Sequence, residues 1–227
     1  MLSSYKKKLH MMRDVIQHHL VRLCTFAFGF LLYCIGGLSH ANTTPGYMMS
    51  IQMTPAICML DPSLAKKRKC LEGYSLNIQG LYPELYNRNC RTNSSAELSP
   101  LQAKVVARVM PDEVARQQLW RETGGCTEMN ASQYFRTIIN FADRLKVPAM
   151  MTGQQTHVVY ENILRSMFIR LNSGLPTNAI HFQCQKSGNK FYLTSVQICY
   201  GVNGRYKSCV SEPVSNCPNS FTIKGSY

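Results

Sequence analysis

Beyond residue 42 of this 227-residue chain, short apolar-rich segments precede and follow a middle part in which apolar residues recur at helical spacing. The segment Tyr47–Met53 (YMMSIQM) is short, rich in apolar residues and followed by Thr54-Pro55, so we expect a first strand that stops there. A second strand is predicted at Tyr74–Ile78, and Gly80 ends it.

The middle part favours helices. The segment SPLQAKVVARVMP begins with a cap-like Ser99, has Pro at the first helical position and is stopped by Pro111. Its apolar residues at helical spacing are Leu101, Val105, Val106 and Val109. Three further helices are predicted, at Asp112–Glu122, Ser132–Leu145 and Asn162–Leu171. The apolar face of the second of these consists of Tyr134, Phe135, Ile138, Phe141 and Leu145.

After the helices, the period changes to that of strands. Alternation predicts strands at Ala179–Cys184, Lys190–Cys199 and Ser220–Ile223. Gly188-Asn189 and Asn203-Gly204 are typical hairpin-turn dipeptides. The sequence contains no repeats or low-complexity linkers. The order of its elements therefore predicts a single α+β domain with a central antiparallel sheet and helices packed on it.

The first 41 residues have the layout of a secretory signal peptide. A basic lead from Lys6 to Arg22 precedes an apolar run from Leu23 to Leu38, and small residues occupy the positions that signal peptidase inspects. The run is shorter than the roughly 20 residues that span a bilayer, so we expect cleavage after Ala41 rather than a retained anchor. The predicted organisation is a signal peptide at 1–41 and a secreted or periplasmic domain at 42–227.

The mature part contains eight of the ten cysteines: Cys58, Cys70, Cys90, Cys126, Cys184, Cys199, Cys209 and Cys217. An even number behind a signal peptide predicts four disulfides in an oxidising compartment. A zinc site is less favoured, because the mature part has no C-x-x-C pair and only two histidines. We expect no metal and no other cofactor.

The mature part is basic. Residues 42–227 hold 20 Lys and Arg against 11 Asp and Glu, a net charge of +9. This excess suits a polyanion such as RNA, or a membrane surface, although many secreted proteins share it. The densest run, Lys66–Lys69, lies between Cys58 and Cys70, and a solvated loop is favoured there over a binding site.

Several short motifs follow one another in a recognisable order. IQMTPAIC (51–58) is followed by NIQGLYP (77–83), by Cys90 and by LSPLQAKVVARVMP (98–111). QLWRETGGC (118–126), Tyr134-Phe135 and a tail from FQCQKSGNKFYLTSVQICY to NCPNSFTIKGSY complete the series. The series resembles the ribonuclease T2 family of secreted acid endoribonucleases, most closely bacterial periplasmic ribonuclease I, over essentially the whole mature part.

The resemblance implies a ribonuclease T2-like fold for the mature part. NIQGLYP corresponds to the first catalytic box of the family, x-x-HGLWP, and QLWRETGGC to the second, HEWEKHGTC. The implied disulfides are Cys58–Cys70, Cys90–Cys126, Cys184–Cys217 and Cys199–Cys209. Of these, Cys90–Cys126 would join the two boxes.

The resemblance also implies a chemistry, and the residues that perform it are replaced. Enzymes of this family transfer the RNA 2′-hydroxyl to the adjacent phosphorus and leave a 2′,3′-cyclic phosphate, for which histidines exchange protons. The positions that carry the catalytic groups are occupied by Gln79, Gln118, Leu119, Glu122 and Thr123. Gln and Thr exchange no proton near neutral pH, and Glu122 reverses the charge of a lysine. We therefore predict no intact catalytic set and activity lower by several orders of magnitude.

The two remaining histidines lie outside both boxes. We expect His157 to be exposed near the start of a helix. His181 lies in a predicted strand whose Ile180 and Phe182 face the other way, so a structural role is favoured over a catalytic one.

The boxes keep scaffold-like residues, namely Gly80, Leu81, Tyr82, Pro83, Trp120, Gly124 and Cys126. The rings of Tyr82 and Trp120 suit stacking on bases, and the polar replacements suit hydrogen bonds to phosphate or base edges. The residues expected to contact RNA are Gln79, Tyr82, Gln118, Trp120 and Thr123. The alternative, in which Tyr82 and Trp120 only fill the core behind an inactive site, stays open.

The sequence therefore predicts a secreted pseudoenzyme of ribonuclease T2-like fold that retains RNA or nucleotide binding. A weakly active or altered endoribonuclease, using Glu122 or a mobile histidine, is the first alternative. A protein-interaction module of the cell envelope is the second. We expect a monomer that contacts no membrane after signal cleavage.

Overall fold

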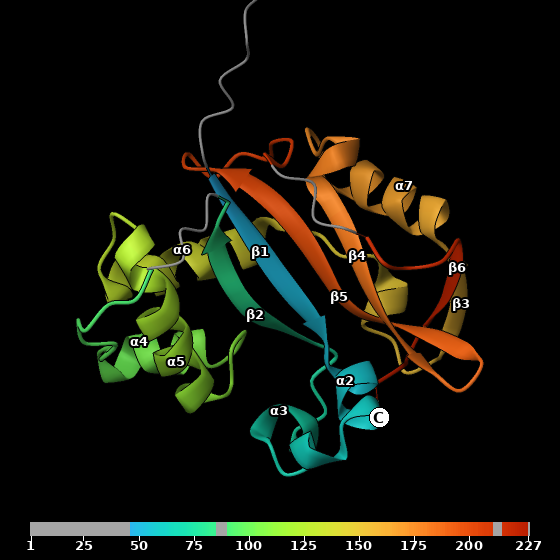
Figure 1. Ribbon diagram of the computed structural model, residues 1–227, viewed down its shortest axis with the longest axis horizontal. Helices are drawn as coiled ribbons and strands as arrows, with labels where there is room; N and C mark the ends of the chain where they lie inside the picture. Colours follow the sequence, from blue (N-terminus) through green and yellow to red (C-terminus); the bar gives the residue numbers. More distant parts are fainter. Residues whose placement is uncertain (1–45, 85–89, 211–214, 227) are drawn as a thin grey trace, which may run out of the picture. The chain divides into compact units, whose positions relative to one another are not determined.

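The computed structural model describes residues 46–84, 90–210 and 215–226, where six strands form one sheet (Figure 1). The strands are β1 Gly46–Met53, β2 Leu76–Pro83, β3 His157–Tyr160, β4 Ile180–Ser187, β5 Lys190–Gly201 and β6 Ser220–Ile223. Their order is β2-β1-β5-β6-β3, and β4 pairs with β5 beside this path. The strands β2 and β3 therefore end the path on opposite sides. The predicted signal peptide and its cleavage site lie outside the described residues.

The sheet is mixed rather than purely antiparallel. All strand pairs are antiparallel except β5 with β6, which pair in parallel at Tyr192 and Thr222. The β4–β5 hairpin turns at Gly188 and Asn189, where Ser187 pairs with Lys190 as the dipeptide predicts.

Six helices accompany the sheet in the described part of the chain. They are α2 Thr54–Leu60, α3 Arg68–Leu71, α4 Pro100–Val106, α5 Glu113–Thr123, α6 Ala131–Arg144 and α7 Glu161–Leu171. Short 3₁₀ turns occur at Pro62–Leu64, Gly124–Cys126, Ala149–Met151 and Thr177–Ala179. Each of the four helices predicted from spacing is present, with ends shifted by a few residues.

Side-chain caps explain where the middle helices begin. Ser99 Oγ accepts a backbone N–H of α4 at 3.4 Å, and Pro100 starts that helix. The Asp112 carboxylate accepts a backbone N–H of α5 at 3.2 Å. Asn130 and Gln133 form a reciprocal capping box at the start of α6.

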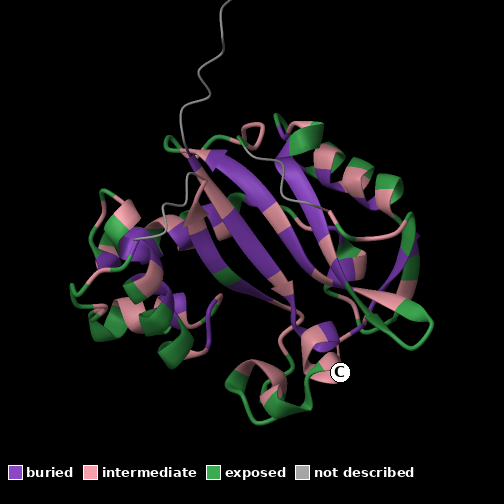
Figure 2. Cartoon of the chain, viewed as in Figure 1, coloured by how far each residue is buried: buried purple, intermediate pink, exposed green. Residues whose placement is uncertain are grey.

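The core lies between the sheet and α6. Met49 of β1 pairs with Ile198 of β5, so both side chains point to the same face of the sheet, and both are buried. On that face Phe141 of α6 stacks on Tyr200 of β5, with ring centroids 4.3 Å apart. Figure 2 shows the central strands buried along most of their length, while the surrounding helices keep exposed outer faces.

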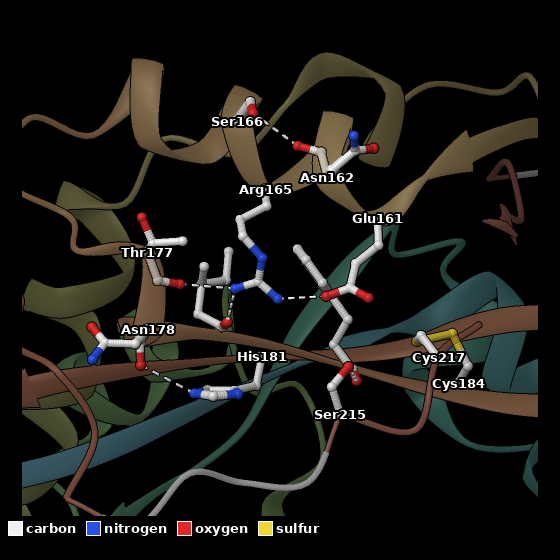
Figure 3. A network of polar contacts seen from close by, with 12 residues as sticks. Glu161, Asn162, Arg165, Ser166, Thr177, Asn178, His181, Cys184, Ser215 and Cys217 are labelled. Carbon is white, nitrogen blue, oxygen red and sulfur yellow. Dashed lines mark hydrogen bonds and ion pairs between the residues drawn. A yellow bond between two sulfur atoms is a disulfide. The ribbon is translucent and has the colours of Figure 1, made fainter. Parts of the chain in front are cut away.

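A network of polar contacts joins α7 to the start of β4 (Figure 3). Arg165 donates to the Thr177 carbonyl at 2.8 Å and to the Ile180 carbonyl, and its guanidinium pairs with Glu161 at 2.5 Å. The same guanidinium lies 5.1 Å from the centre of the Phe182 ring. The helix is therefore held to β4 by a satisfied cation rather than by apolar packing alone.

Thr54 and Pro55 follow the last residue of β1, as predicted, and they start α2, where a proline in the first turn is tolerated. Two local predictions are wrong. The second strand does not end at Gly80, since β2 continues to Pro83. His157 lies in β3, not at the start of a helix, and pairs with Ile223.

Four disulfides close loops in the described chain, in the pairing that the resemblance implied. They join Cys58 to Cys70, Cys90 to Cys126, Cys184 to Cys217 and Cys199 to Cys209. Within the described residues, no helix has the length and apolar character needed to cross a membrane.

Candidate functional site

A bulge in β2 presents Gln79. Ser50 of β1 pairs with Gly80 and the next residue, Ile51, pairs with Ile78, so Gln79 is an extra residue without a partner across the ladder. Such a bulge turns a side chain out of the regular alternation. The Gln79 side chain is exposed, and its Oε1 accepts a hydrogen bond from Ser50 Oγ at 3.1 Å.

Next to the bulge, α5 packs against β2 at Gly80. A methyl group placed on Gly80 would lie 2.7 Å from the Tyr82 ring and 2.8 Å from Leu119 Cδ1. Only glycine leaves room for this contact. Leu119, which stands where the resemblance places a catalytic acid, is 5% exposed. The position that should carry a carboxylate is therefore part of the apolar packing between α5 and the first box.

Tyr134 of α6 joins the two boxes. Its hydroxyl donates to the Leu81 carbonyl at 2.7 Å and accepts the Leu81 N–H at 3.3 Å. The same hydroxyl lies 3.4 Å from Thr123 Oγ1 at the end of α5. Burial raises the pKa of Tyr134 well above that of a free tyrosine, so this hydroxyl stays protonated and serves as a structural bridge.

Trp120 and Thr123 face the core. Trp120 is 2% exposed, and its Nε1 donates to the Ser94 carbonyl at 3.1 Å. Thr123 is 0% exposed, and its hydroxyl donates to the Leu119 carbonyl at 2.7 Å. In this structure neither side chain is available to RNA, contrary to the expectation from the sequence. For Trp120, the structure agrees with the alternative in which this side chain fills the core.

Gln118 and Glu122 lie on the solvent side of α5. Gln118 is exposed, and its Nε2 donates to Glu122 Oε1 at 2.9 Å. Both flank Leu119 on the helix, next to its contact with Gly80. Of the expected contact residues, Gln79, Gln118 and the half-buried Tyr82 are accessible along this junction, which we call the box junction.

Neither His157 nor His181 lies on a strand next to β2, which carries the first box. β3, which carries His157, ends the strand path on the side opposite to β2. His181 is buried in β4, separated from β2 by β5 and β1, and its Nε2 lies 3.2 Å from the Asn178 carbonyl. The structural role expected for His181 fits this contact.

The Cys90–Cys126 disulfide attaches the segment after the first box to the end of the second. Beside it, the Gly125 N–H donates to the Cys90 carbonyl at 2.8 Å, and the Thr92 N–H donates to the Arg121 carbonyl at 2.9 Å. The described part of this segment therefore follows α5 closely, and the two boxes are joined covalently as well as by packing.

The basic run between Cys58 and Cys70 is partly engaged within the fold. Lys69 Nζ donates to Gln52 Oε1 at 2.6 Å, and burial lowers its pKa. Arg68 pairs with Glu72 at 2.5 Å, and Lys67 Nζ lies 3.8 Å from an Asp112 oxygen. The run is thus less available to an external polyanion than its sequence suggests.

One cluster of ligand-type side chains occurs among the described residues, formed by Glu84, Cys199 and Cys209. Both sulfurs belong to one disulfide, so they offer no thiolate to a metal. Glu84 has a structural role instead. Its carboxylate accepts the N–H groups of Gly46 and Val210, each at 2.9 Å, and pairs with Lys207.

A cavity of about 660 Å³ lies on another side of α5. Its lining includes Glu113, Arg116, Gln117 and Arg121 of the helix, and the 92–98 segment, but not Gln79 or Gln118. Neither Gln118 nor Glu122 belongs to the lining, so this cavity is distinct from the Gln118–Glu122 pair.

Tyr134 and Glu84 are the residues that sequence reasoning missed. Spacing marked Tyr134 only as part of an apolar helix face, and nothing near Glu84 in the sequence indicates its partners. Both act through contacts with residues more than 35 positions away. The only sequence signal was the Tyr134-Phe135 pair that follows the second box.

No protein-family profile and no curated protein sequence matches this chain. Its structure is nevertheless similar to several solved ribonucleases. The self-incompatibility SF11-RNase of Nicotiana alata superposes with a TM-score of 0.64 at 12% identity, over 80% of this chain and 99% of the other. Japanese pear S3-RNase gives 0.62 at 15% identity, over 81% and 100%. RNase MC1 from bitter gourd seeds gives 0.61 at 14% identity, over 78% and 98%.

Proposed function

We propose that this chain, which has the ribonuclease T2 fold, is a pseudoenzyme that binds RNA or nucleotides at the box junction without cleaving RNA efficiently. The observation that carries the proposal is the burial of Leu119 and Thr123, at 5% and 0% exposure. These two positions, where the family resemblance places an acid and a histidine, belong to the packing against Gly80 and Tyr134.

The proposed inactivity follows from proton transfer. Attack by a 2′-hydroxyl needs a base that takes its proton and an acid that protonates the departing 5′-oxygen. Gln79 and Gln118 carry amides that do neither near neutral pH. Each missing acid or base lowers the rate by roughly 10²–10⁴, and such losses are not additive. Glu122, which the first alternative requires as a substitute, already accepts a hydrogen bond from Gln118.

The proposed ligand follows from the groups that remain accessible. The amides of Gln79 and Gln118 donate and accept hydrogen bonds, which suits base edges and phosphate oxygens. Tyr82 offers an aromatic ring for stacking. RNase MC1 and RNase NT have been crystallised in complexes with 5′-UMP and 5′-AMP, respectively. The net charge of +9 on residues 42–227 favours the approach of a polyanion.

We also propose that the protein is exported, with residues 1–41 removed as a signal peptide, to the outside of the cell or the periplasm. Four disulfides support an oxidising destination. Sequencing of the exported protein from its amino terminus tests this proposal, and we expect it to begin at Asn42.

The catalytic half of the proposal is tested by incubating the purified protein with RNA and analysing the ends. We expect no 2′,3′-cyclic phosphate ends above the background of a mock purification. Cleavage that survives stringent purification and disappears in Gln79→Ala would instead support the weak nuclease.

The binding half is tested by titrating a short fluorescent RNA at low and moderate salt. Tyr82→Ala is expected to weaken binding by about tenfold, the equivalent of one stacked base. Tyr160→Ala is the matched control, because Tyr160 is 64% exposed on β3 at the other end of the strand path. Equal effects of both variants, or no RNA binding at low salt, would favour the envelope interaction module.

A further inference from the structure

A second cavity, of about 480 Å³, lies where α6, α7 and the turn after β5 meet. Its lining includes three cationic side chains, Arg144, Lys146 and Arg205. Leu171 and the rings of Tyr200 and Tyr206 form its apolar part. Both helices end here, since α6 stops at Arg144 and α7 at Leu171. We call this cavity the basic pocket.

The basic pocket has an uncompensated positive charge. No acidic side chain belongs to its lining, and within the described chain none of its three cations lies within 4.0 Å of a carboxylate. The larger cavity beside α5 differs, because Glu97 and Glu113 there balance Arg116 and Arg121. Cations that converge on a concave surface raise the local potential for an anion.

Helix ends alone do not account for these cations. A helix C-terminus carries roughly half a negative charge, so two of them offset about one of the three positive charges. Arg144 lies in the last turn of α6, where it stabilises that helix. Arg205, however, belongs to the turn after β5 and to no helix. An excess of about two positive charges is left for a ligand.

Hydrogen bonds fix the segments that carry the cations. Asn172 Oδ1 accepts from the Lys146 N–H at 2.9 Å and from the Tyr206 hydroxyl at 3.0 Å. Its Nδ2 donates to the carbonyls of Lys146 and Phe168, at 2.7 and 2.9 Å. Asn172 is buried and fully used, so the pocket is assembled before any ligand arrives.

Arg144 is held over the turn of the pocket. Gly204 has a φ of +74°, a conformation that favours glycine, and a methyl group on it would lie 3.2 Å from Arg144 Nη1. The positive charge of Arg144 acts on the hydroxyls of Tyr200 and Tyr206 and opposes the increase of their pKa values that burial causes. The guanidinium therefore lies near both rings and close to the turn.

The basic pocket is separate from the box junction. Tyr200 pairs with Tyr47 of β1, whereas Tyr82 of β2 pairs with Met48. Consecutive residues of a strand point to opposite faces, so the Tyr200 ring and the Tyr82 side chain lie on opposite faces of the sheet. A ligand in the basic pocket therefore does not occupy the box junction.

We propose that the basic pocket binds a small organic phosphate, with the phosphate on Arg144, Lys146 and Arg205 and the organic part on Leu171 and Tyr206. Arginine suits phosphate because its planar guanidinium offers paired donors to two oxygens. Leu171 is 40% exposed, which leaves apolar surface for an organic group to cover. A volume of about 480 Å³ is typical of small-molecule sites.

The proposal is tested by calorimetric titration of the disulfide-bonded protein with pyrophosphate, adenosine and ADP, which measures the affinity for each. All proteins carry Tyr82→Ala, which weakens nucleotide binding at the box junction, so the remaining signal there is the same in every variant compared. We expect the protein to bind ADP more tightly than pyrophosphate, and to bind adenosine only weakly.

Arg144→Gln and Arg205→Gln should each lower the affinity for ADP and for pyrophosphate by about tenfold, as expected for a lost charge-assisted hydrogen bond.

Three further variants separate the parts of the site. Lys146→Gln should lower the affinity for both ADP and pyrophosphate. Lys190→Gln, which removes a charge at the exposed β4–β5 turn, should change neither affinity. Leu171→Asn should lower the affinity for ADP but leave that for pyrophosphate unchanged. Equal ADP and pyrophosphate affinities, with no effect of Leu171→Asn, would overturn the organic part of the proposal. No saturable binding at low salt, or equal losses in Lys146→Gln and Lys190→Gln, would overturn the site.

Discussion

Two buried tyrosines show how differently one chemical group is used in this molecule. The Tyr134 hydroxyl contacts both backbone groups of Leu81 and the Thr123 hydroxyl. The Tyr200 hydroxyl is also buried, but its contact with the Tyr206 hydroxyl lacks good hydrogen-bond geometry, and the Tyr206 hydroxyl donates to Asn172. The first hydroxyl is well hydrogen-bonded, and the second has only this weaker contact.

Removing these two hydroxyls should therefore have different effects. Tyr134→Phe leaves the Leu81 groups unpaired in the core, so we expect the free energy of unfolding to fall by about 1–3 kcal/mol. Tyr200→Phe removes only the poorly aligned contact with the Tyr206 hydroxyl, so we expect a change within about 0.5 kcal/mol or a gain in stability. Urea unfolding at pH 7 measures both. Equal losses would show that the Tyr200–Tyr206 contact is a full hydrogen bond in solution.

The same tyrosines should make the fold labile to alkali. Burial raises the pKa values of Tyr134 and Tyr200 above the ordinary value of 10.0, so the folded state keeps protons that the unfolded state releases. Their contribution to stability is complete below pH 10 and is lost as the pH rises above it. Melting temperatures between pH 8 and 11 should show a steep fall above pH 10, and a smaller one in Tyr200→Phe. Identical profiles would contradict this assignment.

At the scale of elements, apolar spacing and capping residues were enough to predict the helices, whose contacts are local in sequence. Ser99, Asp112 and Asn130 cap their helices, and each is a residue type that marks a helix start in the sequence. The short strand β3 was missed, because its four residues are defined by pairing with β6, at least 60 positions away. The continuation of β2 past Gly80 was missed because the neighbouring strand, not the local sequence, keeps it extended.

The accessibility of the candidate site residues could not be predicted from the sequence. The Cys90–Cys126 disulfide joins the two boxes as the resemblance implied, yet Leu119 and Thr123 are buried while Gln118 is exposed. The sequence of α5 is mostly polar and has no clear apolar stripe, so its buried face is set by Gly80 and Tyr134 from other elements. Contacts with residues of other elements cannot be recognised in the amino-acid sequence of the helix alone.

Burial of the replaced positions leads to a prediction for α5. Leu119→Glu places a carboxylate against Gly80 and Tyr82, and Thr123→His overfills a position with 0% exposure. We expect each to lower the free energy of unfolding by about 2–4 kcal/mol. Gln118→His, on the exposed side of the same helix, should change it by less than about 0.5 kcal/mol. Chemical denaturation compares the three, and equal stabilities would show that the site still accepts the catalytic groups.

At the scale of the whole molecule, one carboxylate connects the end of the first box to distant segments. Glu84 follows β2 directly, and its side chain is 3% exposed. It binds the N–H of Gly46 at the start of β1, the N–H of Val210, and the Lys207 ammonium. Because this carboxylate is buried, the loss of one member of its ion pair should be costly.

Substitution of Glu84 should consequently affect stability more than any exposed acid does. Glu84→Gln keeps the shape but removes the charge that faces Lys207, so we expect a loss of about 2–4 kcal/mol in the free energy of unfolding. Glu72→Gln is the matched control, because its partner Arg68 is 55% exposed and exposed ion pairs contribute little to stability. Thermal and urea unfolding of both variants measure the difference, and equal effects would contradict the role assigned to Glu84.

The Cys90–Cys126 bond also has a consequence for timing. It joins the two halves of the box junction, and a thiol pair in a reducing cytosol does not form it. Under the proposed function and export, newly made chains would lack a finished binding surface while they remain among the ribosomal and messenger RNA of the cell. Disulfide formation would then complete the proposed binding surface only after the protein has left the compartment where RNA is most abundant.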